Sequence, residues 1–131
     1  MSFVLDTSAI LAYIEDEPGA DTVQSIFDGE EDVFLPWPVL MEVYYMSMRE
    51  RGQHEAETRF ALLKHSPVNI LWEVEETLLL RAATIKAKNK LSFADSVIAS
   101  YTIQNNSILV HKDPEYESLS NQVEMEILPY K

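Results

Sequence analysis

The feature that most constrains the fold is a short apolar run, Phe3 to Leu5, that stops at Asp6 and is followed by a helical pattern from Ala9 to Glu15. An uninterrupted apolar strand suits a parallel sheet that is covered on both faces, and such sheets bind ligands beyond the carboxyl ends of their strands. Asp6 stands at such an end. The local pattern also fits a simpler role, because an Asp at 6 or a Ser at 8 can cap the following helix by accepting a backbone N–H.

The rest of the chain alternates between strand and helix patterns. Short apolar runs predict strands at 33–35, 68–71, 107–110 and 123–128, and helical spacing predicts helices at 20–27, 38–51, 53–65, 74–88 and 91–104. In the last strand, Met125, Ile127 and Leu128 are expected to be buried. Strands that alternate with helices indicate an α/β fold of three layers, α/β/α, with a central and mainly parallel sheet of four or five strands. A length of 131 residues fits one domain, spanning 1–131.

The composition narrows the cellular setting. The chain has no cysteine, which excludes disulfides, thiolate metal sites and cysteine nucleophiles. Met1 to Phe3 do not form the charged start of a secretory signal, and no apolar run approaches the roughly 18 residues of a membrane span. We therefore expect a cytoplasmic protein without a membrane partner.

The chain is strongly acidic. Lys and Arg total 10 against 22 Asp and Glu, a net charge of −12. Nucleic-acid affinity comes largely from cationic side chains that displace counterions, so this chain is not expected to bind a polyanion without help. A nucleic-acid substrate would require bound cations as intermediaries. Lys86, Lys88 and Lys90 form the one basic group; they complement a helix dipole at its carboxyl end, or they contact phosphate.

Four acids are placed where a sheet of this kind would gather them. Asp6 and Asp113 follow strands, Asp95 opens the helix before the fourth strand, and Glu42 points inward from the helix after the second. Mutual repulsion in such a cluster is relieved by Mg²⁺ or Mn²⁺, which prefer oxygen ligands. The chemistry that the site supports is hydrolysis of a phosphodiester by water activated by metal and attacking phosphorus in line.

Each of these acids also has a purely structural interpretation. Glu42 could pair with Arg49 or Arg51. Asp95 forms an approximate capping box with Ser92, and Asp113 could be an N-cap followed by a proline.

The order of the motifs is more specific than any one of them. Val4-Leu5-Asp6-Thr7-Ser8-Ala9, Val39-Leu40-Met41-Glu42-Val43, Leu91-Ser92-Phe93-Ala94-Asp95 and Leu109-Val110-His111-Lys112-Asp113 together resemble the PIN-domain ribonucleases, and in length the VapC-type toxins of toxin–antitoxin pairs. The resemblance implies a PIN-like fold, in which Asp6, Glu42, Asp95 and Asp113 are the catalytic and metal-binding acids and Ser8 orients substrate or water. The chain departs from the family at His111, where Thr or Ser is frequent.

The resemblance also implies partners and cofactors. It implies one or two Mg²⁺ or Mn²⁺ ions, an RNA substrate with transfer RNA as one candidate, a homodimer, and an antitoxin protein that often inserts an arginine among the carboxylates. An acidic rim would attract and pair with such a basic segment. A set of large side chains on the predicted helix 38–51 and just before it could form the dimer or antitoxin surface: Trp37, Tyr44, Tyr45, Met46 and Met48.

Two alternatives to a nuclease remain open from the sequence. A haloacid-dehalogenase-like phosphatase also begins with a strand that ends in an acid, but that family has a second Asp two residues later, where this chain has Ser8. A non-catalytic PIN-like module that binds proteins would keep its acids for stability or recognition, because a fold does not establish an activity.

Overall fold

The computed structural model describes residues 1–130, which form a five-stranded sheet flanked by helices. The strands are β1 (Phe3–Leu5), β2 (Val33–Pro36), β3 (Asn69–Leu71), β4 (Ile108–His111) and β5 (Glu124–Ile127). Their order is β3-β2-β1-β4-β5, and every neighbouring pair is parallel. The predicted α/β class and the parallel sheet are confirmed.

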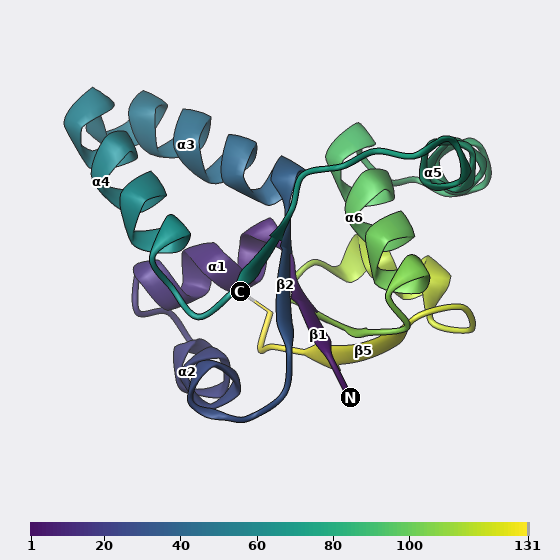
Figure 1. Cartoon of the computed structure of the whole chain (residues 1–131), viewed down its shortest axis with the longest axis horizontal. Helices are drawn as coiled ribbons and strands as arrows, with labels where there is room; N and C mark the ends of the chain where they lie inside the picture. Colours follow the sequence, from purple (N-terminus) through teal and green to yellow (C-terminus); the bar gives the residue numbers. More distant parts are fainter. Residues whose placement is uncertain (131) are drawn as a thin grey trace.

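Helices cover both faces of this sheet. They are α1 (Thr7–Ile14), α2 (Ala20–Asp28), α3 (Trp37–Arg51), α4 (Gln53–Lys64), α5 (Glu76–Lys88) and α6 (Phe93–Gln104). Helices α1 to α4 lie on one side of the sheet, and α6 lies on the other with α5 packed outside it (Figure 1). Gly52 reverses the chain between α3 and α4 with a φ of +92°, a conformation that side chains with a Cβ adopt only with strain. The result is the predicted three-layer α/β/α arrangement.

The strand order reverses direction at β1. The chain moves outward from β1 to β2 and β3, then returns to place β4 on the other side of β1 and β5 beyond it. The amide of Asp6 donates to the carbonyl of Val110 at 3.1 Å, which keeps the two strand ends together. In open α/β sheets, the crevice at such a switch point is where ligands bind.

The core is built from the strands and the inner faces of the helices. Val4 and Leu5 of β1, Leu35 of β2, and Leu109 and Val110 of β4 are fully buried. At roughly 2 kcal/mol for each buried aliphatic side chain, these central strands supply much of the energy that holds the carboxyl ends of β1 and β4 in place. A smaller cluster under α5 and α6 contains Leu78, Ala82, Val97 and Tyr101.

Some local predictions differ from the structure. Helix α1 begins at Thr7 rather than Ala9, because the Asp6 side chain caps it. A 3₁₀ helix, η1 (Pro114–Leu119), follows β4 and was not predicted. The expected burial of Ile127 is wrong: this side chain is 49% exposed, because β5 is an edge strand. Nowhere in residues 1–130 is there a helix with the length and hydrophobicity needed to cross a membrane.

Candidate active site

Asp6 is held rigidly at the end of β1. Its side chain is 2% exposed, and its Oδ1 accepts the Ala9 amide at 2.8 Å as the N-cap of α1. The Ser8 hydroxyl donates to the same carboxylate, 2.7 Å from Oδ1 and 2.9 Å from Oδ2. Ser8 Oγ in turn accepts the Lys112 amide at 2.9 Å, which ties β1 to the segment after β4. The capping interpretation of Asp6 is therefore correct, and it coexists with a place at the switch point.

Asp95 lies in the first turn of α6, where Ser92 is the N-cap and accepts the Asp95 amide at 3.1 Å. Its side chain is half-buried and accepts a hydrogen bond from the Tyr116 hydroxyl at Oδ1, at 2.9 Å. Tyr116 belongs to η1, so the unpredicted 3₁₀ helix contributes directly to the site.

Asp113 follows β4 and caps η1 by accepting the Glu115 amide at 2.9 Å. Its own amide donates to His111 Nδ1 at 3.1 Å. His111 is fully buried, and burial lowers its pKa below the usual value despite the nearby Asp113 and Glu117 charges, so the ring is neutral at neutral pH. The bond from Nδ1 to the amide two residues on is the one that a Ser or Thr hydroxyl makes in this kind of turn. The ring therefore replaces the hydroxyl expected at this position.

Glu42 is half-buried on α3 and accepts a hydrogen bond from the Thr7 hydroxyl at 2.5 Å. The arginine partners considered from the sequence are engaged elsewhere: Arg51 Nη2 lies 3.6 Å from Glu15 Oε1, and Arg49 lies over the ring of Tyr45. Within residues 1–130, no cation pairs with Glu42.

The electrostatics show that these acids share one environment. Burial, with smaller contributions from the charges of Asp95 and Asp113, raises the pKa of Asp6 to about 7 against the hydrogen bonds from Ala9 and Ser8. Burial likewise raises the pKa of Asp95 to about 6, with contributions from Asp113 and Glu42. The charges of Asp95 and Asp113 thus act on Asp6, and those of Asp113 and Glu42 act on Asp95. The carboxylates of Asp6 and Asp95 therefore resist ionisation unless a positive charge joins them.

Three carboxylates are close enough to hold one ion. Oxygen atoms of Asp95, Asp113 and Glu115 all lie within 4.8 Å of one another. An all-carboxylate set with an exposed member fits a hard divalent cation that keeps several waters, as Mg²⁺ and Mn²⁺ do. Asp6 and Glu42 lie outside this triad and act on it electrostatically. The sequence analysis did not identify Glu115. Its position directly after Pro114, two residues beyond Asp113, was a signal for a turn.

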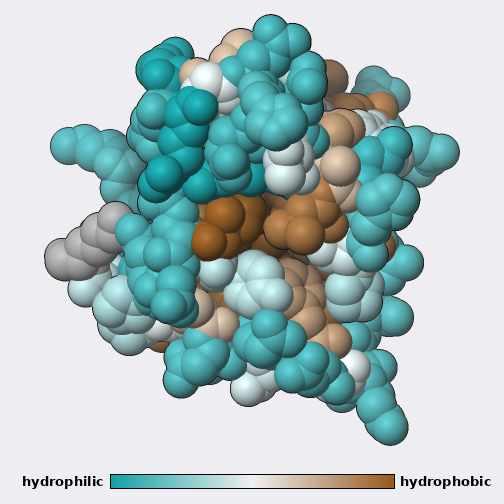
Figure 2. All heavy atoms as spheres, turned by 90° about the vertical axis from the view of Figure 1, so that its left-hand side faces the viewer, coloured by the Kyte–Doolittle hydropathy of each residue, from teal (hydrophilic) through white to brown (hydrophobic). Residues whose placement is uncertain are grey.

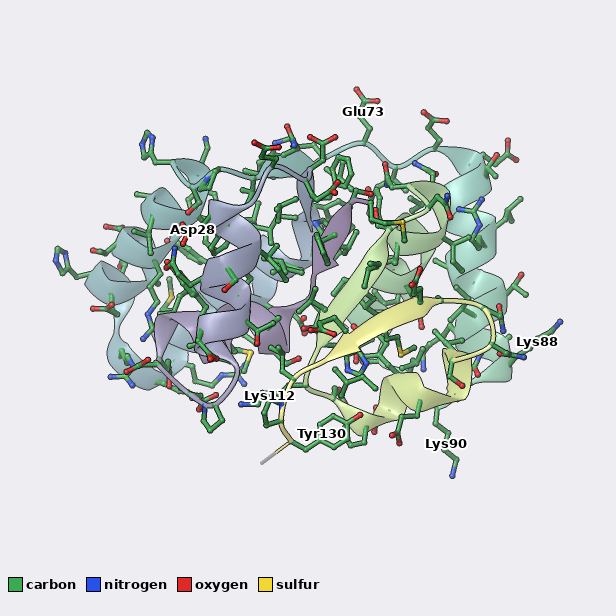
Figure 3. All side chains as sticks on the ribbon, turned by 90° about the horizontal axis from the view of Figure 1, so that it is seen from below. Asp28, Glu73, Lys88, Lys90, Lys112 and Tyr130 are labelled. Carbon is green, nitrogen blue, oxygen red and sulfur yellow. The ribbon has the colours of Figure 1, made fainter. Side chains whose placement is uncertain are left out.

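A cavity of 460 Å³ adjoins the acids on the side of Ser8 and Asp113. Its lining includes two buried cations that are already paired: Arg59 with Glu15 and Glu55, and Lys112 with Glu17. Figure 3 shows Lys112 beside Tyr130, and both line this cavity. Lys88 and Lys90 instead project into solvent from the end of α5 and the turn after it.

The large side chains of α3 do not form one surface. Met46 lines the cavity beside the acids, whereas Trp37, Tyr44 and Tyr45 line an apolar groove of 820 Å³ on another part of the molecule. A second apolar groove of 550 Å³, between α5 and α6, shares Trp37 with the first. We call the exposed apolar residues of these two grooves, together with Trp37, the Trp37 surface: Trp37, Met41, Tyr45, Trp72, Val74, Leu79 and Phe93.

Comparison with known sequences yields one family. The PIN domain profile matches residues 3–121, most of the chain. No curated protein sequence matches the chain significantly.

Solved structures share the fold at low sequence identity. VapBC2 from Rickettsia felis, bound to a DNA fragment from its promoter, aligns with a TM-score of 0.79 and 15% identity over 98% of this chain and 99% of that chain. VapBC-1 from nontypeable Haemophilus influenzae gives 0.75 and 17% over 97% and 98%. Mycobacterium tuberculosis VapC20, a toxin that cleaves the sarcin-ricin loop, gives 0.73 and 16% over 97% and 99%. The chain therefore has the fold of these proteins over nearly its whole length.

Proposed function

Because this chain belongs to the PIN domain family, we propose that it is a divalent-metal-dependent endoribonuclease and the toxin of a toxin–antitoxin pair. The observation that carries the proposal is the convergence of Asp95, Asp113 and Glu115 beside the buried Asp6 at the switch point of the sheet. The fold shared with VapC20, a toxin that cleaves the sarcin-ricin loop, supports the substrate class. RNA as the substrate implies that the protein acts in the cytoplasm.

The acids are the residues that would hold the metal. Asp95, Asp113 and Glu115 provide the nearest oxygens, and we assign Asp6 and Glu42 to the same site because their charges bear on Asp95. When bound, one or two Mg²⁺ or Mn²⁺ ions supply positive charge that stabilises the transition state of phosphodiester hydrolysis and lower the pKa of water. Positive charge at the site would also favour the ionised forms of Asp6 and Asp95, whose pKa values burial raises to about 7 and about 6.

The neighbouring residues keep this site in one geometry. The Ser8 hydroxyl and the Ala9 amide fix Asp6, and the Thr7 hydroxyl fixes Glu42. In this arrangement Ser8 acts through Asp6 and the Lys112 amide, both of which it already contacts, and so positions the acid that faces substrate or water. Exposed Lys88 and Lys90 are available to contact RNA phosphates away from the scissile bond.

The antitoxin partner is supported by the surface as well as by the fold. VapBC structures are toxin–antitoxin pairs, and two of them match nearly the whole chain. The side of the molecule where α1, α2 and α4 lie has a hydrophobic centre surrounded by hydrophilic residues (Figure 2). With a net charge of −12, the chain suits a partner segment that combines apolar and basic residues. We assign the homodimer contact to the Trp37 surface, since contiguous exposed apolar area marks protein interfaces.

The experiment compares wild-type protein with Asp95→Asn, prepared identically, on a panel of structured RNAs that includes transfer RNAs. Each is assayed with Mn²⁺, with Mg²⁺ and with EDTA. Wild type should give discrete products only with metal, and Asp95→Asn should lose at least about 100-fold in rate, because removing a ligand costs more than removing the partner of a ligand. Asp28→Asn, an exposed acid on α2, is the matched control and should cleave as wild type does.

Equal cleavage by wild type and Asp95→Asn would mean either that a contaminating nuclease is present or that Asp95 is not part of the active site. In both cases the assignment would lose its support. Calorimetric titration with Mn²⁺ separates the nuclease from a non-catalytic PIN-like module. The module predicts no binding at millimolar metal.

A further inference from the structure

Tyr116 has a hydroxyl that its packing does not require. The side chain is fully buried and belongs to the main hydrophobic core, where a phenylalanine ring would fill the same space. Burying a hydroxyl costs free energy unless it finds a partner. Here the partner is Asp95, whose Oδ1 accepts the hydroxyl at 2.9 Å. The hydroxyl therefore serves the carboxylate rather than the core.

His111 stands next to Tyr116 and makes the corresponding contact to the second acid. The two rings pack with centroids 4.8 Å apart. Nδ1 of His111 accepts the Asp113 amide at 3.1 Å, so the ring proton lies on Nε2, which is 3.3 Å from the Met125 sulfur. The ring is enclosed on both edges. It can neither rotate nor flip without losing the bond to Asp113.

We propose that Tyr116 and His111 form a positioning pair that fixes Asp95 and Asp113 in the orientation that a divalent cation requires. This inference rests on the proposed function, because it assigns the two acids to a metal site. Tyr116 holds one oxygen of the Asp95 carboxylate, and His111 holds the backbone that carries Asp113. The packed rings join the two contacts, so the separation of two acids from different elements is set by one rigid unit.

The pair acts by orientation and not by contact with substrate. Ligands held in place by neighbouring groups lose less conformational entropy when the ion arrives, and partners of metal ligands typically contribute about 10- to 100-fold to metal affinity. The pair has a feature that a sequence motif does not reveal: its two members come from β4 and η1, and only the fold brings the Tyr116 hydroxyl to α6.

The test measures Mn²⁺ affinity by calorimetry on the full-length, metal-free protein at a temperature well below unfolding. Tyr116→Phe removes only the hydroxyl and should bind Mn²⁺ about 10- to 100-fold more weakly than wild type. Tyr101→Phe is the matched control: Tyr101 is 1% exposed, and its hydroxyl donates to the Glu73 carbonyl, remote from the acids. This control should bind as wild type does.

The outcomes separate the inference from the proposed function. Wild-type protein that does not bind Mn²⁺ would overturn the metal site itself. Wild type that binds, with Tyr116→Phe binding equally well, would overturn the positioning role alone. Equal losses in Tyr116→Phe and Tyr101→Phe would also overturn it, because general loosening of the fold would then be the cause.

A second pair of variants tests His111 and remains informative if Tyr116→Phe folds poorly. His111→Thr and His111→Val have similar shapes, and both remove the ring, but only Thr keeps an acceptor for the Asp113 amide. We expect His111→Val to bind Mn²⁺ at least about tenfold more weakly than His111→Thr. Equal affinities would show that the bond to Asp113 does not position it.

Discussion

We call Asp6, Glu42, Asp95, Asp113 and Glu115 the acidic cluster. This cluster contains a buried carboxyl group, whereas the Trp37 surface exposes large apolar side chains. In the first region Asp6 is 2% exposed, and burial raises its pKa to about 7. In the second, Phe93 is 73% exposed. Folded proteins ordinarily place these two kinds of side chain the other way round.

The buried carboxyl group and the exposed apolar side chains both cost folding free energy in the isolated chain. A suitable ligand would offset each cost. A cation offsets the repulsion among the acids, and an apolar partner removes the exposed rings from water. Local departures of this kind are expected at functional sites, where the rest of the fold supplies the missing stability. One small molecule therefore carries two regions of opposite chemical character.

Helix α6 belongs to both regions. Asp95 is part of the acidic cluster, while Phe93, Ser96 and Val97 of the same helix line the groove between α5 and α6. The first turn of α6 thus carries residues of both the acidic cluster and the apolar surface. A substitution in α6 can therefore be tested for its effect on binding at both regions.

The largest expected effect comes from pH. The pKa of Asp6 is about 7 in the folded protein, against 3.8 for an unperturbed Asp. Between these values the folded state binds a proton that the unfolded state does not, so the free energy of unfolding falls as pH rises through this window. The contribution from Asp6 reaches at most about 4 kcal/mol, at 1.36 kcal/mol for each pH unit.

The measurement is chemical denaturation in EDTA from about pH 4 to about pH 7.5, with wild type, Asp6→Asn and Asp28→Asn. Asn caps helices as Asp does, so Asp6→Asn should keep the fold and become steadily more stable relative to wild type as pH rises. Asp28→Asn, at an exposed position, should show no such trend. If the free energies of unfolding of wild type and Asp6→Asn differ by the same amount at all pH values, burial does not raise the pKa of Asp6.

The parts of the site that follow strands could be predicted from the sequence, because the carboxyl ends of parallel strands meet at one edge. Asp6 and Asp113 are in this group, and the run of apolar residues before each was the signal. Glu42 was predicted from helical spacing, and Asp95 from its place at the start of the helix before the fourth strand. The structure places the Glu42 charge close enough to raise the pKa of Asp95.

The parts that were missed depend on tertiary contacts with no local pattern. Glu115 joins the triad because Pro114 starts a 3₁₀ turn that folds back on Asp113. Tyr116 resembles an ordinary core aromatic in the sequence, and only the packing of η1 against α6 shows its bond to Asp95. The large side chains of α3 were assigned to one surface, but a helix presents different residues to different neighbours, and the structure separates Met46 from Trp37.

The Trp37 surface is tested by a charge placed in it. Leu79→Asp should weaken self-association at least about tenfold, because a charge in an apolar interface is desolvated without a partner. Leu62→Asp is the control: Leu62 is 53% exposed and lies on α4, outside the surface, whereas Leu79 is 54% exposed. Sedimentation equilibrium measures both. Wild type that is monomeric at high concentration, or a Leu79→Asp protein that associates as wild type does, would remove the homodimer contact from this surface.

The smallest expected effect concerns α6, the helix that contributes residues to both regions. Ser92→Ala removes the N-cap of α6, whose hydroxyl accepts the Asp95 amide, and should lower the free energy of unfolding by about 1 kcal/mol. Since this residue caps the turn that carries both Asp95 and Phe93, fraying should weaken Mn²⁺ binding and self-association together, each by only a few-fold. Ser92→Asp restores a capping acceptor and should recover the stability and the self-association, though its added charge faces the acids. Loss of one kind of binding without the other in Ser92→Ala would mean that the two regions are held independently, and that α6 does not couple them.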